Sequence, residues 1–190
     1  MPLPLIFRAA TLDDRDALIA LVTSAYRGEA SRAGWTTEAD LLDGPRIVPE
    51  VLEHELRRLR SVVLIAEREG TMLGCAQVCD EGGTGHFGMF AVDPRQQGAG
   101  IGDALLHECE RIAGEDWRLP VMRMTVIDVR DELIAWYERR GYRRTGLKKP
   151  FPYGDARFGA PKREDLRFEV LEKSLSPQSA IPSLLPQVSR

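Results

Sequence analysis

The sequence predicts a single mixed α/β domain, and three observations carry this prediction. Helical periodicity alternates with β-rich runs in the order strand, helices, three strands, helix, strand, helix and further strands. A glycine-rich turn at residues 98–102 stands between one β-rich run and one amphipathic helix. The chain has 190 residues, 43% of them hydrophobic, which is enough for one well-buried core and too little for two ordinary domains.

The first 60 residues predict one strand and three helices. Residues 5–10 can form a strand, and Thr11 with Asp14 resembles a capping box at the start of the first helix. A short acidic helix containing residues 38–42 is expected next, and a third helix begins near Pro49. The expected inward positions are Leu18, Leu21, Val22 and Ala25 in the first helix and Leu52, Leu56 and Leu59 in the third.

The remaining elements alternate between strands and helices. Residues 148–165, rich in glycine, proline, aromatic and basic residues, are expected to be a loop, and 174–190 a disordered or surface-draped tail. The folded domain should therefore cover residues 5–173. The expected strands are 61–67, 71–79, 86–92, 120–127 and 166–171, with a hairpin at Glu69-Gly70 and helices after the glycine turn and at 130–140.

Composition limits the classes of partner. The net charge of −3 gives no field that would favour nucleic acid or an anionic membrane, so small ligands are the better expectation. The cysteines, Cys75, Cys79 and Cys109, form no Cys-x-x-Cys pair and have no nearby histidine cluster, so we interpret them as reduced core thiols and expect no metal. The N-terminus lacks a signal-peptide pattern, and no run reaches membrane-spanning length, which indicates a cytoplasmic protein.

The glycine turn has the properties of a phosphate-binding site. Gly98, Gly100 and Gly102 remove side chains that would keep a ligand away from backbone N–H groups at a helix start. The same pattern also occurs as a plain strand-to-helix turn. A Walker loop would end in Gly-Lys-Ser/Thr, whereas here Asp103-Ala104 follow. The glycine spacing also departs from Gly-x-Gly-x-x-Gly, and Asp128 lies too far along the chain, so a nicotinamide-dinucleotide enzyme is disfavoured.

The segment Gln97-x-x-Gly100-x-Gly102, preceded by Val92-Asp93-Pro94, resembles the acetyl-coenzyme A signature of the GCN5-related N-acetyltransferase (GNAT) superfamily. The resemblance implies the GNAT fold, a mixed central sheet of about six or seven strands flanked by about four or five helices. It also implies acetyl-CoA as acyl donor, with the pyrophosphate on the loop and the pantetheine arm along the preceding strand. The coenzyme contacts so implied are Phe90, Ala91, Val92, Gln97, Gly98, Ala99, Gly100, Ile101 and Gly102.

A second segment, residues 134–142, is similar to the family pattern Ala-x-x-Leu-Tyr-x-x-x-Gly-Phe/Tyr. The resemblance places Tyr137 opposite the thioester sulfur. A phenol of pKa about 10 can donate a proton to a departing thiolate of pKa about 8.5. The alternative for Tyr137 is a core aromatic on an amphipathic helix. Many relatives carry an Asn seven residues before the tyrosine, where this chain has Arg130, so Arg130 or Asp131 is expected to replace that coenzyme contact.

Acyl transfer to an amine also needs a base and donors for the developing oxyanion. An alkylamine of pKa about 10.4 costs roughly 4 kcal/mol to deprotonate at neutral pH. By strand parity His86 shares a face with Gly88 and Phe90, and it resembles a histidine of the arylalkylamine acetyltransferases. As the base it would give an inflection in the pH profile between about 6 and 8. Glu81, Asp80 and ordered water remain alternatives, and backbone N–H groups near 90–92 are the implied oxyanion donors.

The acceptor side of the site is left open by the sequence. Trp35, Glu38 and Asp40 would suit a cationic amine, whereas Tyr153, Arg157, Phe158, Lys162 and Arg163 in the late loop would suit an anionic one. Either set can equally be a solvated face or loop packing. The resemblance implies direct transfer to a primary amine of a small molecule or peptide. The alternative is a catalytically silent acyl-CoA-binding regulatory module, and a homodimer is compatible with either function.

Overall fold

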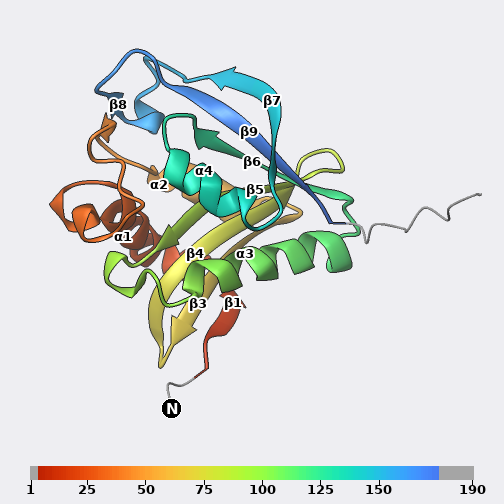
Figure 1. Ribbon diagram of the computed structural model, residues 1–190. Coiled ribbons are helices and arrows are strands. Elements are labelled where there is room, and N and C mark those ends of the chain that lie inside the picture. Colours follow the sequence, from red (N-terminus) through yellow and green to blue (C-terminus); the bar gives the residue numbers. More distant parts are fainter. Residues whose placement is uncertain (1–3, 176–190) are drawn as a thin grey trace, which may run out of the picture.

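The structure, a computed structural model, describes residues 4–175 and is built on one seven-stranded sheet (Figure 1). Its strand order is β1-β3-β4-β5-β6-β9-β7, and all neighbours are antiparallel except β5 and β6. The sheet confirms the predicted mixed α/β fold. The strands are β1 (Ile6–Ala9), β3 (Ser61–Arg68), β4 (Thr71–Asp80), β5 (Gly85–Val92), β6 (Val121–Ile127), β7 (Arg143–Pro150) and β9 (Arg167–Ser174).

Four helices cover the two faces of the sheet and make three layers (Figure 1). The helices α1 (Arg15–Tyr26) and α2 (Pro49–Arg57) pack on one face, where Leu18 and Leu52 are fully buried. The helices α3 (Ile101–Arg111) and α4 (Asp131–Glu138) pack on the other, where Leu105 and Ile134 are fully buried. None of the helices in residues 4–175 has the length and apolarity needed to span a membrane.

The predicted start of α1 is confirmed in its contacts. The N–H of Thr11 donates to the Asp14 carboxylate at 2.8 Å, and a 3-10 turn, Leu12–Asp14, leads into the helix. This contact satisfies a backbone donor that the helix start would otherwise leave free. The inward positions predicted for α1, Leu18, Leu21, Val22 and Ala25, are all buried.

Two expectations between α1 and β3 are wrong. Residues 38–42 form a turn rather than an acidic helix, because the N–H groups of Leu41 and Leu42 both donate to the Glu38 carbonyl and the chain then enters β2 (Leu42–Asp43). Strand β2 pairs with β8 (Ala160–Pro161) in a separate two-stranded sheet. Leu59 is 89% exposed, because α2 ends at Arg57 before the apolar stripe reaches it.

The C-terminal part of the sheet extends further than predicted. Part of the expected loop 148–165 belongs to β7, a strand of exposed residues, half of them charged, that forms by pairing with β9. Strand β9 reaches Ser174, and the N–H of Leu175 donates to the Pro120 carbonyl. The first two residues of the expected tail are thus part of the domain, and residues 176–190 lie outside the described range.

Candidate active site

The sheet opens between its two parallel strands. β5 and β6 pair only at their first residues, Gly85 with Met122 and His86 with Arg123. Beyond these pairs, side chains of both strands line a common pocket of about 250 Å³, called here the second pocket. An opening between adjacent strands at the carboxyl end of a parallel pair is a usual place for a ligand.

A β-bulge shapes the β5 side of this opening. Met89 and Phe90 stand opposite the single residue Ala76 of β4, and Met89 takes a φ of +44°, which is rare for a residue with a side chain. The bulge changes the strand's alternation, so Phe90 packs against Phe87 with ring centroids 5.2 Å apart. The parity prediction is therefore wrong for Phe90, because Phe87 and His86 point to opposite faces.

The glycine turn lies at the start of α3 and lines a pocket of about 300 Å³, called here the cradle pocket. Gly98 and Gly100 have φ values of +83° and +80°, and no atom lies within 4 Å of a Cβ built at either residue. A Cβ on Gly102 would lie 2.9 Å from Cζ of Phe90. The first two glycines are thus required by backbone conformation and leave open space, whereas the third permits close packing on Phe90.

The side chain of Gln97 fastens a neighbouring loop to the cradle pocket. Its Oε1 accepts from the N–H of Trp35 at 2.9 Å, and its Nε2 donates to Oγ1 of Thr36 at 2.8 Å. The indole of Trp35 lies 6.5 Å from that of Trp136, measured between ring centroids, and lines the cradle pocket. Trp35, expected on the acceptor side, therefore lines the cradle pocket, and the Gln97 carboxamide holds this loop in place.

Arg140 is a basic residue of the cradle pocket that the sequence analysis missed. Its guanidinium carbon lies 3.6 Å from the Trp136 ring centroid, and its Nε donates to Oδ1 of Asp103 at 2.6 Å. The only local signal is its position in the Glu-Arg-Arg-Gly run, which contains a second arginine, Arg139. A cation beside a helix start would favour an anionic ligand.

Tyr137 is buried on α4 and lines the second pocket. Its ring contacts the aromatic rings of Phe87 and Trp136, at centroid distances of 6.4 Å and 5.1 Å. Burial raises the pKa of its phenol well above the ordinary value, so the hydroxyl remains protonated at neutral pH. A protonated phenol in this position can act as a proton donor.

Tyr26, a second phenol that the sequence analysis did not single out, joins the two pockets. Its ring lines both of them, and its hydroxyl donates to the carbonyl of Phe90 in the bulge. Burial raises the pKa of this phenol as well. Its place on the inward stripe of α1 makes it look like an ordinary packing residue, which explains why the periodicity gave no functional signal.

His86 lies at the β5 edge of the second pocket, with its Cε1 3.6 Å from a Cβ built on Gly88. Burial lowers the pKa of its imidazole below the ordinary value, and Glu81 opposes this effect. His86 is therefore neutral at neutral pH and able to accept a proton. Asp80 is a poorer base, because the N–H of Gly83 and the guanidinium of Arg60 hold the pKa of its carboxyl below the usual range.

The structure also brings together a group that the sequence did not predict. Donor atoms of Cys79, Glu81 and His86 lie within 4.8 Å of one another. Burial raises the pKa of the Cys79 thiol to about 11, and a nitrogen of Arg58 lies 3.5 Å from its sulfur. These three residues line a separate pocket on the α2 side of the sheet, together with Arg58 and Val51.

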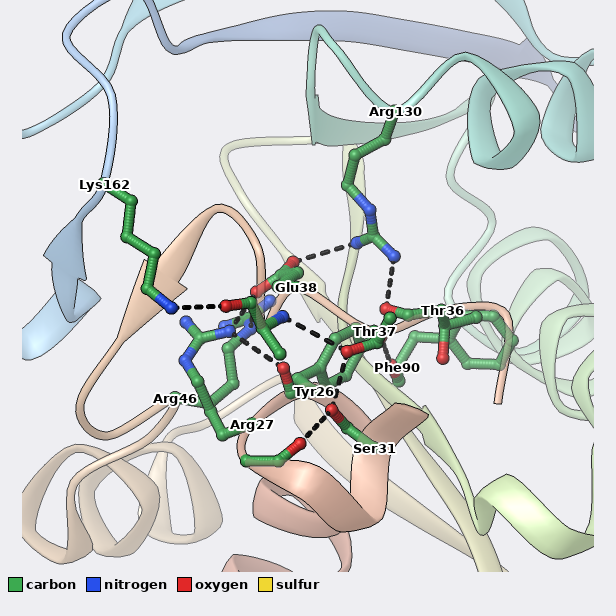
Figure 2. A network of polar contacts seen from close by, with 12 residues as sticks. Tyr26, Arg27, Ser31, Thr36, Thr37, Glu38, Arg46, Phe90, Arg130 and Lys162 are labelled. Carbon is green, nitrogen blue, oxygen red and sulfur yellow. Dashed lines mark hydrogen bonds and ion pairs between the residues drawn. The ribbon is translucent and has the colours of Figure 1, made fainter. Parts of the chain in front are cut away.

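Glu38 and Arg130 meet in a buried ion cluster (Figure 2). The Glu38 side chain is 3% exposed and accepts from Nη1 of Arg27 at 2.5 Å and from Nη1 of Arg130 at 2.9 Å. Burial opposes ionisation of Glu38, but the guanidinium groups of Arg46, Arg130 and Arg27 outweigh it and lower the pKa of the carboxyl. Arg130, expected at the coenzyme, lines the second pocket.

The late loop contributes less to the site than expected. The hydroxyl of Tyr153 accepts from the N–H of Leu166 at 2.8 Å and donates to the carbonyl of Arg163 at 3.1 Å, so Tyr153 stabilises its own loop. Lys162 donates to the Ala39 carbonyl at 2.7 Å. Phe158 alone of this set lines the second pocket. The remaining predicted residues form exposed ion pairs, Arg157 with Asp155, Arg163 with Asp165 and Asp40 with Arg32.

A comparison with protein families agrees with this arrangement of an opened mixed sheet and a glycine turn. Residues 60–144 match the sequence profile described as an acetyltransferase (GNAT) domain. The match covers somewhat less than half of the chain, and over these residues the chain is similar to a GNAT domain. A comparison of the whole sequence with curated proteins gives no match.

Solved structures agree with this assignment of the fold. The ribosomal-protein-S18-alanine N-acetyltransferase from Escherichia coli superposes with a TM-score of 0.68 at 17% identity, over 94% of this chain and 98% of that one. A putative phosphinothricin N-acetyltransferase superposes with a TM-score of 0.66 at 20% identity, over 92% of this chain and 100% of that one. A PaiA N-acetyltransferase from Thermoplasma acidophilum, solved in complex with coenzyme A, gives 0.64 at 17%, over 90% and 99%.

Proposed function

We propose that this protein transfers the acetyl group of acetyl-CoA directly to a primary amine of a small molecule or peptide. The observation that carries the proposal is the placement of a glycine cradle and a buried, protonated phenol on two pockets that share Tyr26 and Phe90. An acyl donor held in the cradle pocket can thus present its thioester to the second pocket. One similar structure is a ribosomal-protein-S18-alanine N-acetyltransferase and another is a putative phosphinothricin N-acetyltransferase, and at 17–20% identity they select neither acceptor class.

The cradle fits an anionic coenzyme. Open space faces Gly98 and Gly100, their backbone lies at the start of the eleven-residue helix α3, and Arg140, which is ion-paired with Asp103, lines the same pocket. We assign the pyrophosphate of acetyl-CoA to the backbone N–H groups of residues 97–102. Ile101 is buried in the core, so it contributes through its backbone only.

Three groups of the second pocket would carry the chemistry. Tyr137 would donate a hydrogen bond or its proton to the departing thiolate, and neutral His86 would accept the proton of the amine, directly or through water. Met89 and Phe90 have no register partner in β4, so we assign the N–H of Phe90 to the polarisation of the thioester carbonyl. This arrangement supplies an acid, a base and a backbone donor without a metal.

An amine-panel assay tests the proposal. Acetyl-CoA is mixed with the protein and with amino acids, polyamines, aminoglycosides or N-terminal peptides, and the release of free thiol is followed against a no-amine control. The proposal expects at least one amine class to release thiol above the control. Saturable acetyl-CoA binding without release by any class would favour the silent binding module instead.

A further inference from the structure

The second pocket carries a positive charge that the proposed chemistry does not use. Its permanently charged lining residues are Arg27, Arg46, Arg130 and Glu38, which leaves a net charge of +2. Arg27 and Arg130 bond the Glu38 carboxylate directly, and Nε of Arg46 lies 3.4 Å from its Oε2. Figure 2 shows Arg130 reaching Glu38 from above and the other two arginines from below, so one carboxylate orients all three guanidinium groups.

Some of these guanidinium donors lack acceptors. Arg27 is 5% exposed, and its Nε and Nη2 have no hydrogen-bond partner among residues 4–175. Nε of Arg46 is buried and also makes no hydrogen bond there. Burial lowers the pKa of Arg27 from its ordinary value, although Glu38 opposes the effect. Buried donors of this kind are rare and costly, so the cluster is short of negative charge and of acceptor oxygens.

The ring of Tyr26 lies between the arginine cluster and the bulge of β5. The guanidinium carbons of Arg46 and Arg130 lie 5.0 Å and 5.7 Å from the ring centroid of Tyr26. The hydroxyl of the same ring donates to the carbonyl of Phe90. A ligand group at the arginines and an amine near Phe90 can therefore belong to one small molecule.

The rest of the second pocket is largely apolar. Its walls include Phe87, Met124, Phe151, Phe158 and Phe168. These side chains offer a ligand van der Waals contacts, and they carry no negative charge that would compensate the arginines. The pocket therefore combines one cationic end with an apolar body.

We propose that the acceptor is an amine that also carries a carboxylate or another compact oxyanion and an apolar portion, with the oxyanion bound by Arg27, Arg46 and Arg130. This inference rests on the proposed function and names its substrate class. Guanidinium groups form paired, charge-assisted hydrogen bonds with such oxyanions. A polyamine would instead bring further positive charge into a buried cationic pocket, which disfavours it.

Matched substrates that differ only in the oxyanion test the inference. We compare kcat/KM for phenylalanine and phenethylamine, and for methionine and 3-(methylthio)propylamine, with spermidine as the polycationic member. The acid of each pair is expected to exceed its decarboxylated partner by at least about tenfold. The phosphonate analogue of phenylalanine then shows which oxyanion is preferred, and preference for either acid over phenethylamine supports the inference.

Arg46→Gln is the informative variant, because Arg46 is partly exposed and its loss leaves the Arg27–Glu38–Arg130 contacts in place. It should lower kcat/KM for the acids by about ten- to hundredfold and for the decarboxylated amines by less than about threefold. Arg46→Glu should reduce or reverse the preference for the acids over the decarboxylated amines. Arg57→Gln, an equal charge change at an exposed residue of α2 outside the pocket, should leave both values unchanged.

The failure of this inference can be told apart from the failure of the proposed function. Preference for the decarboxylated amines or for spermidine would overturn the inference and leave acetyl transfer standing. If no amine releases thiol, the proposed function fails, and calorimetry with 3-phenylpropionate tests the anion site by itself. Binding to the wild type that is weakened at least about tenfold in Arg46→Gln would still support the site. Absent or unchanged binding would overturn it.

Discussion

The hydroxyl of Tyr26 donates to the backbone carbonyl of Phe90, which ties the last residue of α1 to the bulge of β5. Both residues line the cradle pocket and the second pocket. The contact therefore fixes the bulge, whose backbone we assign to the thioester, relative to the ring on which two arginines lie. This phenol therefore connects the two pockets.

Replacing Tyr137 with phenylalanine tests its role as the proton donor. The variant loses a hydroxyl and little packing, so acetyl-CoA affinity should be unchanged while kcat falls by roughly 10²- to 10⁴-fold. Steady-state kinetics with calorimetry of acetyl-CoA measures both. Tyr142→Phe is the matched control, because that buried phenol bonds Glu110 and lies outside both pockets. Turnover within about threefold of wild type in Tyr137→Phe would make Tyr137 a packing residue.

The cradle can be tested with two alanine substitutions that cause the same backbone strain. Gly100 and Gly70 have φ values of +80° and +73°, and neither would bring a Cβ within 4 Å of another atom. Each alanine should cost about 1–2 kcal/mol of stability. Only Gly100→Ala should also weaken acetyl-CoA binding, because its backbone lies at the start of α3. Equal acetyl-CoA affinities in both variants by calorimetry would contradict the cradle assignment.

The glycine turn and Tyr137 could be found in the sequence because local pattern encodes them. A strand followed by closely spaced glycines and a helix can be recognised without knowing any distant contact. The apolar stripe on α4 follows from the helical period of the sequence. The predicted helix at 38–42 failed for the opposite reason. Glu38 turns inward to meet Arg27 and Arg130, which are 11 and 92 residues away along the chain.

Other parts of the site also depend on contacts that no window of sequence contains. The bulge at Met89 and Phe90 requires β4 as a partner, so strand parity could not anticipate the direction of Phe90. Strand β7 is charged and lacks alternation, and only its pairing with β9 makes it a strand. Arg46 lies in a loop before α2 with no local motif, and its role follows from where that loop lies in space.

The pH dependence of kcat/KM tests His86. Because burial lowers the pKa of its imidazole, the base form is present at neutral pH and is lost only as the pH falls below about 6.5. Ionisation of the amine affects wild type and variant alike. Above that shared effect, log kcat/KM of the wild type should rise through an inflection below about 6.5, toward the lower end of the range expected from the sequence. His86→Ala should remove this inflection. The same inflection at a similar rate in the variant would exclude His86 as the base.

Stability at low pH tests the buried ion cluster. The folded-state pKa of Glu38 lies below its unfolded value, so its contribution is complete above about pH 4.3 and is lost as the pH falls through the folded pKa. Glu38→Gln should lower the free energy of unfolding at pH 7 by about 3 kcal/mol and flatten its dependence on pH below 4.3. Urea titrations measure both, with the exposed Glu29→Gln as control. A Glu38→Gln curve parallel to wild type would contradict the cluster's contribution.

Acetyl transfer itself is tested most directly by product stoichiometry. Phenylalanine or the best amine of the panel is incubated with acetyl-CoA and the protein, and free thiol and N-acetylated amine are quantified in the same sample by thiol titration and mass spectrometry. Direct acetyl transfer predicts equal amounts of the two products, and the rate at which both form should be strongly reduced in Tyr137→Phe. Thiol released without acetylated amine, or equal rates in Tyr137→Phe and wild type, would contradict it.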